Sequence, residues 1–248
     1  MEASPSDLSG PARCPRPTHP PSIVPPRPSR EADAFLTTDS ALPLRIAAIS
    51  PLTEVEGPGK RFAVWAQGCS IRCDGCFNPH LWGAAGGRPT GPDELAQQAL
   101  ASGAEGVTLL GGEPFDQADG FATFARTVRD GGLSVMTFTG HYLEDLRGPD
   151  APPSFAALLA ATDLLVDGPY LADQLDHARP WVGSRNQRFH FLTDRYLHLR
   201  SRLPGLADRL EVRVSPTGEV SINGWADVAA LDELLQDSTP AVGRGSVR

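Results

Sequence analysis

Three cysteines lie close together in the sequence and form the group of residues best suited to bind a metal. Cys69, Cys73 and Cys76 follow a C-x3-C-x2-C spacing, and Gly68 and Gly75 would let the backbone wrap closely around a bound cluster. Three thiolates on such a loop could hold three irons of a cubane iron–sulfur cluster. The fourth iron would then lack a protein ligand, which is the open position that a reactive metal centre needs.

Other interpretations of the same loop stay open at this point. His80 could complete a structural zinc site, because the Cys76-x3-His80 spacing is permissible for zinc. The fourth cysteine, Cys14, could complete a four-cysteine cluster, although it lies far away in a proline-rich stretch. A third alternative is that the three cysteines are buried without binding a metal, but their close spacing weighs against it. The loop by itself therefore indicates a metal and leaves its identity undecided.

Composition narrows the classes of function. The chain has 248 residues and a formal net charge of −8, and an acidic total weighs against a nucleic-acid partner. Apolar runs are all shorter than the ~20 residues that a membrane span requires, and the N-terminus lacks the pattern of a secretory signal. Clustered cysteines also differ from the dispersed framework of a secreted disulfide scaffold. We expect a cytoplasmic protein with no membrane partner.

Composition also divides the chain into three segments. Residues 1–40 are rich in Pro, Ser and Arg, which predicts a disordered extension because such a segment buries little apolar surface. Residues 41–235 carry the alternating apolar patterns of a folded domain, and we expect residues 236–248 to be a disordered tail.

Within residues 41–235, short apolar runs alternate with helical patterns and predict an α/β fold. Strands are expected at 44–49, 62–66, 107–110, 133–138, 164–166 and 189–192, and helices at 91–101, 117–129 and 155–160. This alternation implies parallel βα units, whose ligands gather at the carboxyl ends of the strands. There are too few units for an eight-stranded barrel, so we expect an open, partial βα barrel. Runs at 210–214 and 219–222 around a turn predict a C-terminal β-hairpin extension.

The cysteine loop also resembles a known motif. Its spacing is similar to the cluster motif of the radical S-adenosylmethionine (SAM) superfamily. The Cys-x-Gly-Cys ending, followed by an aromatic residue, Asn78 and Trp82, more narrowly resembles the activating proteins of glycyl-radical enzymes, of the anaerobic ribonucleotide reductase type.

Further segments resemble the same family in the same order, from about residue 56 to residue 190. Residues 56–61 are similar to Asp-Gly-Pro-Gly-x-Arg, with Glu56 in place of the usual Asp. Residues 111–114 read Gly-Gly-Glu-Pro, an element that holds the methionine ammonium in the family. Thr139-Gly140-His141 resembles Thr-Gly-Tyr, with histidine where tyrosine is more usual. Residues 163–170 resemble a strand ending in Val-Asp-Gly, and residues 182–188 a Gly-Ser-x-Asn-Gln-Arg stretch.

The resemblance implies particular cofactors and site residues. It implies a [4Fe–4S] cluster held by the three clustered cysteines, with S-adenosyl-L-methionine (SAM) bound to the open iron. It also implies SAM contacts from Gly111, Gly112 and Glu113 on the methionine side, with Thr139 and Asp167 as further candidates. Members of the family cleave SAM reductively to a 5′-deoxyadenosyl radical, which in activating proteins removes a hydrogen atom from a glycine of a partner enzyme.

The partners implied are a glycyl-radical enzyme, such as anaerobic ribonucleotide reductase, and a flavodoxin or ferredoxin as reductant. Two alternatives remain. A radical SAM enzyme that acts on a peptide or a small molecule could share the same core. A zinc-bound interaction module, with three cysteines and His80 as ligands, belongs to a different class of protein.

Overall fold

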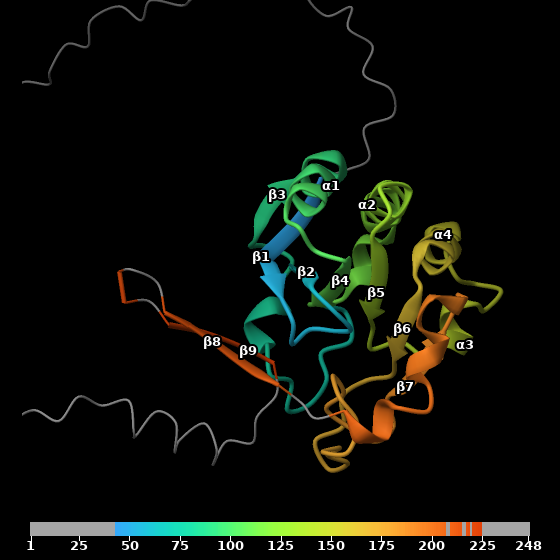
Figure 1. The fold of residues 1–248 in the computed structure, drawn as a ribbon. Coiled ribbons are helices and arrows are strands. Elements are labelled where there is room, and N and C mark those ends of the chain that lie inside the picture. The colour runs from blue at the N-terminus through green and yellow to red at the C-terminus, as the bar shows by residue number, and fades with distance from the viewer. Residues whose placement is uncertain (1–42, 207–208, 215–216, 219, 225–248) are drawn as a thin grey trace, which may run out of the picture. The chain divides into compact units, whose positions relative to one another are not determined.

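The computed structural model describes residues 43–206, 209–214, 217–218 and 220–224. The expected extension at residues 1–40 and the expected tail at residues 236–248 lie outside these described residues. Within them the fold is a mixed α/β arrangement around one large sheet, whose strand order is β3-β1-β2-β4-β5-β6-β7 (Figure 1). The expectation of an α/β fold is thus confirmed.

The large sheet of the described chain consists of β1 (Leu44–Thr53), β2 (Arg61–Ala66), β3 (Arg88–Thr90), β4 (Gly106–Gly111), β5 (Ser134–Phe138), β6 (Leu164–Asp167) and β7 (Arg188–Phe191). Its four central strands, β2, β4, β5 and β6, run parallel to one another. The parallel pairs are β2–β4, β4–β5 and β5–β6, with register partners such as Trp65 and Leu110. Because parallel strands end at the same edge, the segments that follow β2, β4, β5 and β6 meet there.

β1 and β7 run in the opposite direction to the central strands, so the expectation of parallel βα units holds only for β2, β4, β5 and β6. β1 pairs antiparallel with both β2 and β3, and β7 pairs antiparallel with β6. A parallel connection needs a crossover, usually a helix, and the described chain has no helix between β1 and β2 or between β6 and β7. β3, with only three residues, was not among the expected strands.

Three α-helices, α1 (Pro92–Ala101), α2 (Ala118–Asp130) and α4 (Pro153–Ala161), cover one face of the sheet (Figure 1). The remaining described α-helix is α3 (Leu143–Leu146), and the 3₁₀ helices are η1 (Pro79–Leu81), η2 (Pro114–Gln117), η3 (Asp194–Leu199) and η4 (Leu203–Gly205). Figure 1 shows α1, α2 and α4 on the same side of the sheet. α1 begins within one residue of the expected start at 91, with Pro92 at its first position and Asp93 and Glu94 near the positive end of the helix dipole.

Alternating side chains of the central strands build two apolar clusters. In β5, Val135 belongs to the larger cluster, which includes Leu95 of α1 and Phe121 of α2, whereas its neighbour Met136 belongs to a smaller cluster with Tyr196. Successive side chains of a strand point to opposite faces of a sheet. Both faces of the central strands are therefore covered, which explains why these strands read as nearly continuous apolar runs.

Arg61, the last residue of the Glu-Gly-Pro-Gly-Lys-Arg motif, is fully buried at the start of β2. Its guanidinium donates hydrogen bonds to the Thr108 hydroxyl at 2.9 Å, the Ser134 hydroxyl at 2.7 Å and the Tyr196 hydroxyl at 3.0 Å. These bonds join the amino-terminal half of the central sheet to η3. The arginine of this motif therefore stabilises the fold, because β2 separates it from the cysteine loop at the other end of the strand.

β8 (Leu210–Val214) and β9 (Val220–Gly224) pair antiparallel as a separate two-stranded sheet, and residues 215, 216 and 219 between them lie outside the described part of the chain. These strands contact the end of β1 and the connection that follows it. The Thr53 hydroxyl donates to Glu211 Oε2 at 2.5 Å, and the Gly224 N–H donates to Glu56 Oε1 at 3.2 Å. No helix in the described ranges is long and apolar enough to cross a membrane.

Candidate functional site

The motifs singled out in the sequence gather at the carboxyl edge of the parallel strands. The cysteine loop begins at Gln67, directly after β2, and the Gly-Gly-Glu-Pro turn begins in the last residue of β4. Thr139 follows β5, and Asp167 is the last residue of β6. Segments that are up to about 100 residues apart in sequence therefore form one candidate site.

The cysteine loop closes on itself at its base and turns sharply inside. The Gly68 N–H donates to the Leu81 carbonyl at 2.9 Å, and the Cys69 N–H donates to the Trp82 carbonyl at 3.2 Å. Gly68 and Gly75 have positive φ angles of 95° and 74°, so glycine is needed at both turns. The loop thus holds three cysteines within a short arc of backbone.

The thiols of the loop fit a positively charged metal cluster. Cys69, Cys73 and Cys76 are free and partly buried. Burial raises the pKa of the Cys69 and Cys73 thiols, and the negative charge of Glu113 adds to this effect. Bound iron would favour the thiolate by supplying the positive charge that these positions lack. The donor set is therefore the soft sulfur type that iron–sulfur clusters require.

The positions of possible ligands also bear on the choice of metal. His80, the proposed fourth ligand of a zinc site, is exposed in η1. In the described part of the chain, no three His, Cys, Asp or Glu side chains surround the position of a single metal ion. The cysteines of a cubane each bind a different iron, so a cubane does not require its ligands to converge on one point.

The Gly-Gly-Glu-Pro turn packs directly against the cysteine loop. The Gly112 N–H donates to the Ala66 carbonyl and the Glu113 N–H to the Gly68 carbonyl, both at 2.8 Å. A Cβ atom on Gly112 would lie 2.0 Å from the Gly68 carbonyl oxygen. Glycine is therefore required here for the close approach of the chain's own cysteine loop.

The Glu113 side chain points into the protein, with an exposed fraction of 1 %. Its carboxylate accepts hydrogen bonds from the Phe115 N–H at 2.9 Å, the Thr139 hydroxyl at 3.0 Å and the Gly140 N–H at 2.9 Å. Burial raises the pKa of Glu113 to about 7, although these three donors act in the opposite direction. Two of the expected SAM contacts, Glu113 and Thr139, are thus brought together and bind each other.

Two residues of η2 that sequence reasoning missed also hold the cysteine loop. Asp116 accepts hydrogen bonds from the N–H and the hydroxyl of Ser70, each at 2.7 Å. Gln117 donates to the Gln67 carbonyl at 3.0 Å and to the Arg45 carbonyl at 3.1 Å. Their position directly after Gly-Gly-Glu-Pro was a usable signal, because that turn lies beside the loop in the fold. The loop is consequently fixed from β1 and from η2.

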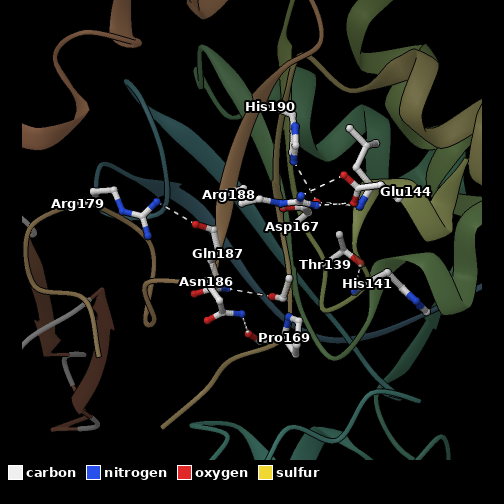
Figure 2. Close-up of polar contacts among 12 residues, drawn as sticks. Thr139, His141, Glu144, Asp167, Pro169, Arg179, Asn186, Gln187, Arg188 and His190 are labelled. Atoms are coloured by element: carbon white, nitrogen blue, oxygen red, sulfur yellow. Dashed lines mark hydrogen bonds and ion pairs between the residues drawn. The ribbon is translucent and has the colours of Figure 1, made fainter. Parts of the chain in front are cut away.

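Asp167, the last of the expected SAM contacts, is fully buried, and its carboxylate is bonded to other residues of the chain. Arg188 donates to both of its carboxylate oxygens, from Nε at 3.0 Å and from Nη2 at 2.5 Å, and the Leu143 N–H donates at 2.7 Å. Figure 2 shows Arg188 between Asp167 and Glu144. The pKa of Glu144 falls to about 2, mainly because of its hydrogen bond with Arg188. Asp167 therefore joins β6, β7 and α3.

Comparisons with known proteins agree with this site. A family model described as a 4Fe-4S single cluster domain matches residues 55–190. The anaerobic ribonucleoside-triphosphate reductase-activating protein of Vibrio cholerae is 30% identical over 153 residues, which cover 58% of this chain and 95% of that protein. The corresponding protein of Salmonella typhimurium is 31% identical over 155 residues, which cover 57% of this chain and 95% of that protein.

A second group of relatives matches over a shorter span. The pyruvate formate-lyase-activating enzyme of Listeria monocytogenes is 30% identical over 131 residues, which cover 49% of this chain and 51% of that protein. The family match includes the cysteine loop and every strand end of the candidate site. It decides between zinc and iron–sulfur in favour of a [4Fe–4S] cluster, with SAM as the second cofactor. The chain belongs to the 4Fe-4S single cluster domain family and is a radical SAM protein related to the activating proteins of glycyl-radical enzymes.

Proposed function

We propose that the chain activates a glycyl-radical enzyme of the anaerobic ribonucleotide reductase type by reductive cleavage of SAM. The observation that carries this proposal is the contact between the cysteine loop and the Gly-Gly-Glu-Pro turn. The Glu113 N–H donates to the Gly68 carbonyl at 2.8 Å, next to Cys69. A cluster on the loop would therefore lie beside the partly exposed carboxyl end of β4, where a ligand of its open iron could be held.

Cys69, Cys73 and Cys76 are the proposed ligands of the cluster. When bound, the cluster supplies the electron that breaks a sulfur–carbon bond of SAM and yields methionine and a 5′-deoxyadenosyl radical. The protein's own part is to hold the reacting groups in place and to exclude water. Ser70, anchored by Asp116 at 2.7 Å, fixes the loop immediately after its first cysteine.

The backbone of Gly111, Gly112 and Glu113 is the proposed contact for the methionine part of SAM. The Glu113 carboxylate accepts from three donors and the Glu113 N–H donates to the Gly68 carbonyl, so we propose that backbone carbonyl oxygens of this turn, rather than the Glu113 side chain, meet the methionine ammonium. We propose that Thr139 and Asp167 act at the same edge by fixing the ends of β5 and β6. Their side-chain bonds to Glu113 and to Arg188 support this role.

The wider assignments follow from the same family. We propose that the sheet is the partial barrel of radical SAM proteins, that residues 41–235 form this domain, and that β8 and β9 are a C-terminal hairpin extension. A flavodoxin or ferredoxin is the proposed reductant, acting in the cytoplasm. Arg72, exposed between Cys69 and Cys73, offers a positive charge to such an acidic partner.

Anaerobic reconstitution of the full chain tests the proposal. With iron, sulfide, dithionite and SAM, we expect a [4Fe–4S] spectrum and the release of 5′-deoxyadenosine. Addition of the large subunit of an anaerobic ribonucleotide reductase should yield a glycyl-radical signal in electron paramagnetic resonance. A protein that binds a cluster but leaves SAM intact would contradict the proposal.

Two variants separate this function from the zinc alternative. Cys73→Ala should lose both the cluster and SAM cleavage, because one iron loses its ligand. His80→Ala, at an exposed position of η1, should keep both. A colourless protein that binds one zinc, and loses it in the His80→Ala variant, would support the zinc module instead.

A further inference from the structure

The segment after β6 is tied to residues 184–188 by a series of side-chain bonds. Beyond the paired residues Asp167 and Arg188, the chains continue side by side without a backbone ladder. We call three of these bonds the polar clamp. Gln187 Nε2 donates to the Gly168 carbonyl at 3.4 Å, and Asn186 Nδ2 donates to the Pro169 carbonyl at 2.7 Å. In the third bond, the Leu171 N–H donates to the Ser184 hydroxyl at 3.1 Å. Figure 2 shows the bond between Asn186 and Pro169.

The clamp residues are themselves held in place. Gln187 Oε1 accepts hydrogen bonds from the Gly183 N–H at 2.8 Å and from the Ser184 N–H at 3.2 Å. Arg179 donates to the Gln187 carbonyl at 2.8 Å and is anchored by Asp176 at 2.6 Å. Ser184 is fully buried. Residues 184–187 therefore form a rigid support against which the segment 168–171 is fixed.

The clamped segment and the residue after it lie against the cysteine loop. The rings of Tyr170 and Phe77 form an edge-to-face pair with centroids 5.0 Å apart. A Cβ atom on Gly75 would lie 3.0 Å from Ala172 Cβ and 3.6 Å from Tyr170 Cε1. Glycine at position 75, between Cys73 and Cys76, thus permits this close packing. The segment after β6 forms a wall of the proposed cluster site.

One backbone group of this wall is directed at a cysteine. The clamp engages the carbonyls of Gly168 and Pro169 and the N–H of Leu171. The backbone amide of the intervening residue, Tyr170, faces the Cys73 thiol. The clamp therefore fixes the residues on both sides of this amide.

We propose that Asn186, together with Ser184 and Gln187, is a positioning residue that sets the reduction potential of the bound cluster by holding the Tyr170 amide against Cys73. Hydrogen bonds to cluster sulfurs stabilise the more negative, reduced state, so their loss lowers the reduction potential. The inference rests on the proposed function, because it requires Cys73 to be a cluster ligand. Residues 184–187 would then influence the cluster indirectly, by positioning the Tyr170 amide, without contacting the cluster themselves.

The test compares Asn186→Leu with Arg185→Lys, an exposed neighbour that keeps its charge. Leucine has the same branched arrangement of side-chain heavy atoms as asparagine but cannot donate to the Pro169 carbonyl. In metal-free protein we expect amide hydrogen exchange in residues 168–172 to rise about tenfold for Asn186→Leu and to stay unchanged for Arg185→Lys. In reconstituted protein, a redox titration should give Asn186→Leu a lower midpoint potential than both wild type and Arg185→Lys. Wild-type exchange and an unchanged potential in Asn186→Leu would overturn the inference.

A second pair of variants removes the amide itself. Tyr170→Pro loses both the aromatic ring and the backbone N–H, whereas Tyr170→Ala loses the ring but keeps the backbone N–H. We expect a lower potential for Tyr170→Pro than for Tyr170→Ala, and equal potentials would overturn the inference even if Asn186→Leu did not fold. A wild-type protein that assembles no cluster would overturn the proposed function and this inference with it. If the wild-type protein cleaves SAM but Asn186→Leu and Tyr170→Pro leave the reduction potential of the cluster unchanged, this inference alone would be overturned.

Discussion

The hydroxyl of Thr139 donates a hydrogen bond to Oε1 of Glu113 at 3.0 Å, and this bond joins the end of β4 to the end of β5. Both residues are buried, with exposed fractions of 5 % and 1 %. The Gly140 N–H donates to the second oxygen of the same carboxylate at 2.9 Å. Glu113 thus holds together two strand ends at the edge where the proposed cofactors bind.

Replacement of Thr139 by Val should weaken this junction. Valine has nearly the same shape but no hydroxyl, so the buried Glu113 carboxylate loses one of its three donors. We expect the free energy of unfolding to fall by about 1–2 kcal/mol, measured by urea denaturation of the metal-free protein. Thr123→Val, at a partly exposed position of α2 where the hydroxyl bonds within the helix, should change stability by less than about 0.5 kcal/mol. Equal stability of Thr139→Val and wild type would show that the bond does not hold the strand ends.

Asp116→Asn should loosen the cysteine loop. The Asp116 carboxylate accepts two hydrogen bonds from Ser70, and an asparagine amide offers a single oxygen and no charge. We expect the reconstituted cluster to be lost to a chelator about tenfold faster than in wild type, as followed by the visible absorbance. Asp119→Asn, an exposed residue in the first turn of α2, is the matched control and should lose its cluster at the wild-type rate. A wild-type rate in Asp116→Asn would mean that other contacts are sufficient to fix the loop.

Features carried by short stretches of sequence were predictable. The cysteine spacing is local, and the strands β2, β4, β5 and β6 are short apolar runs bounded by glycine or polar residues. Because the four are parallel, their order alone places the cysteine loop, Gly112, Thr139 and Asp167 at one edge. The family resemblance and the location of the site therefore followed from the sequence.

Features that depend on distant partners were not predictable. Glu113 could have faced a ligand or the protein interior, and its distant donors Thr139 and Gly140, 26 and 27 residues later, decide this. The same holds for Asn186, whose partner Pro169 lies 17 residues earlier. The direction of β7 also depends on the irregular path of residues 168–187, which carries no helical pattern. A sequence pattern indicates the type of each element but not the residue that it contacts.

Glu56, which stands where the family usually has Asp, should make stability depend on pH. Burial raises its pKa to about 7, with a smaller opposing effect of the Gly224 N–H and a further increase from the charge of Glu211. The usual pKa of a glutamate is 4.5, so between pH 4.5 and 7 the folded protein binds more protons than the unfolded chain. Stability contributed by protonated Glu56 is therefore present at low pH and is lost as the pH rises through this window.

Glu56→Gln isolates this contribution. Glutamine keeps an oxygen that can accept from the Gly224 N–H but does not ionise, so it resembles the protonated acid at every pH. Thermal unfolding of metal-free protein from pH 4.5 to 8 should show a smaller decrease of Tm for Glu56→Gln than for wild type, with the largest difference above pH 7. Glu54→Gln is the matched control, because the Glu54 side chain is 56% exposed and pairs with Arg209 at the surface. If Glu56→Gln followed the wild-type profile, Glu56 would have to ionise in the folded protein as readily as it does in water.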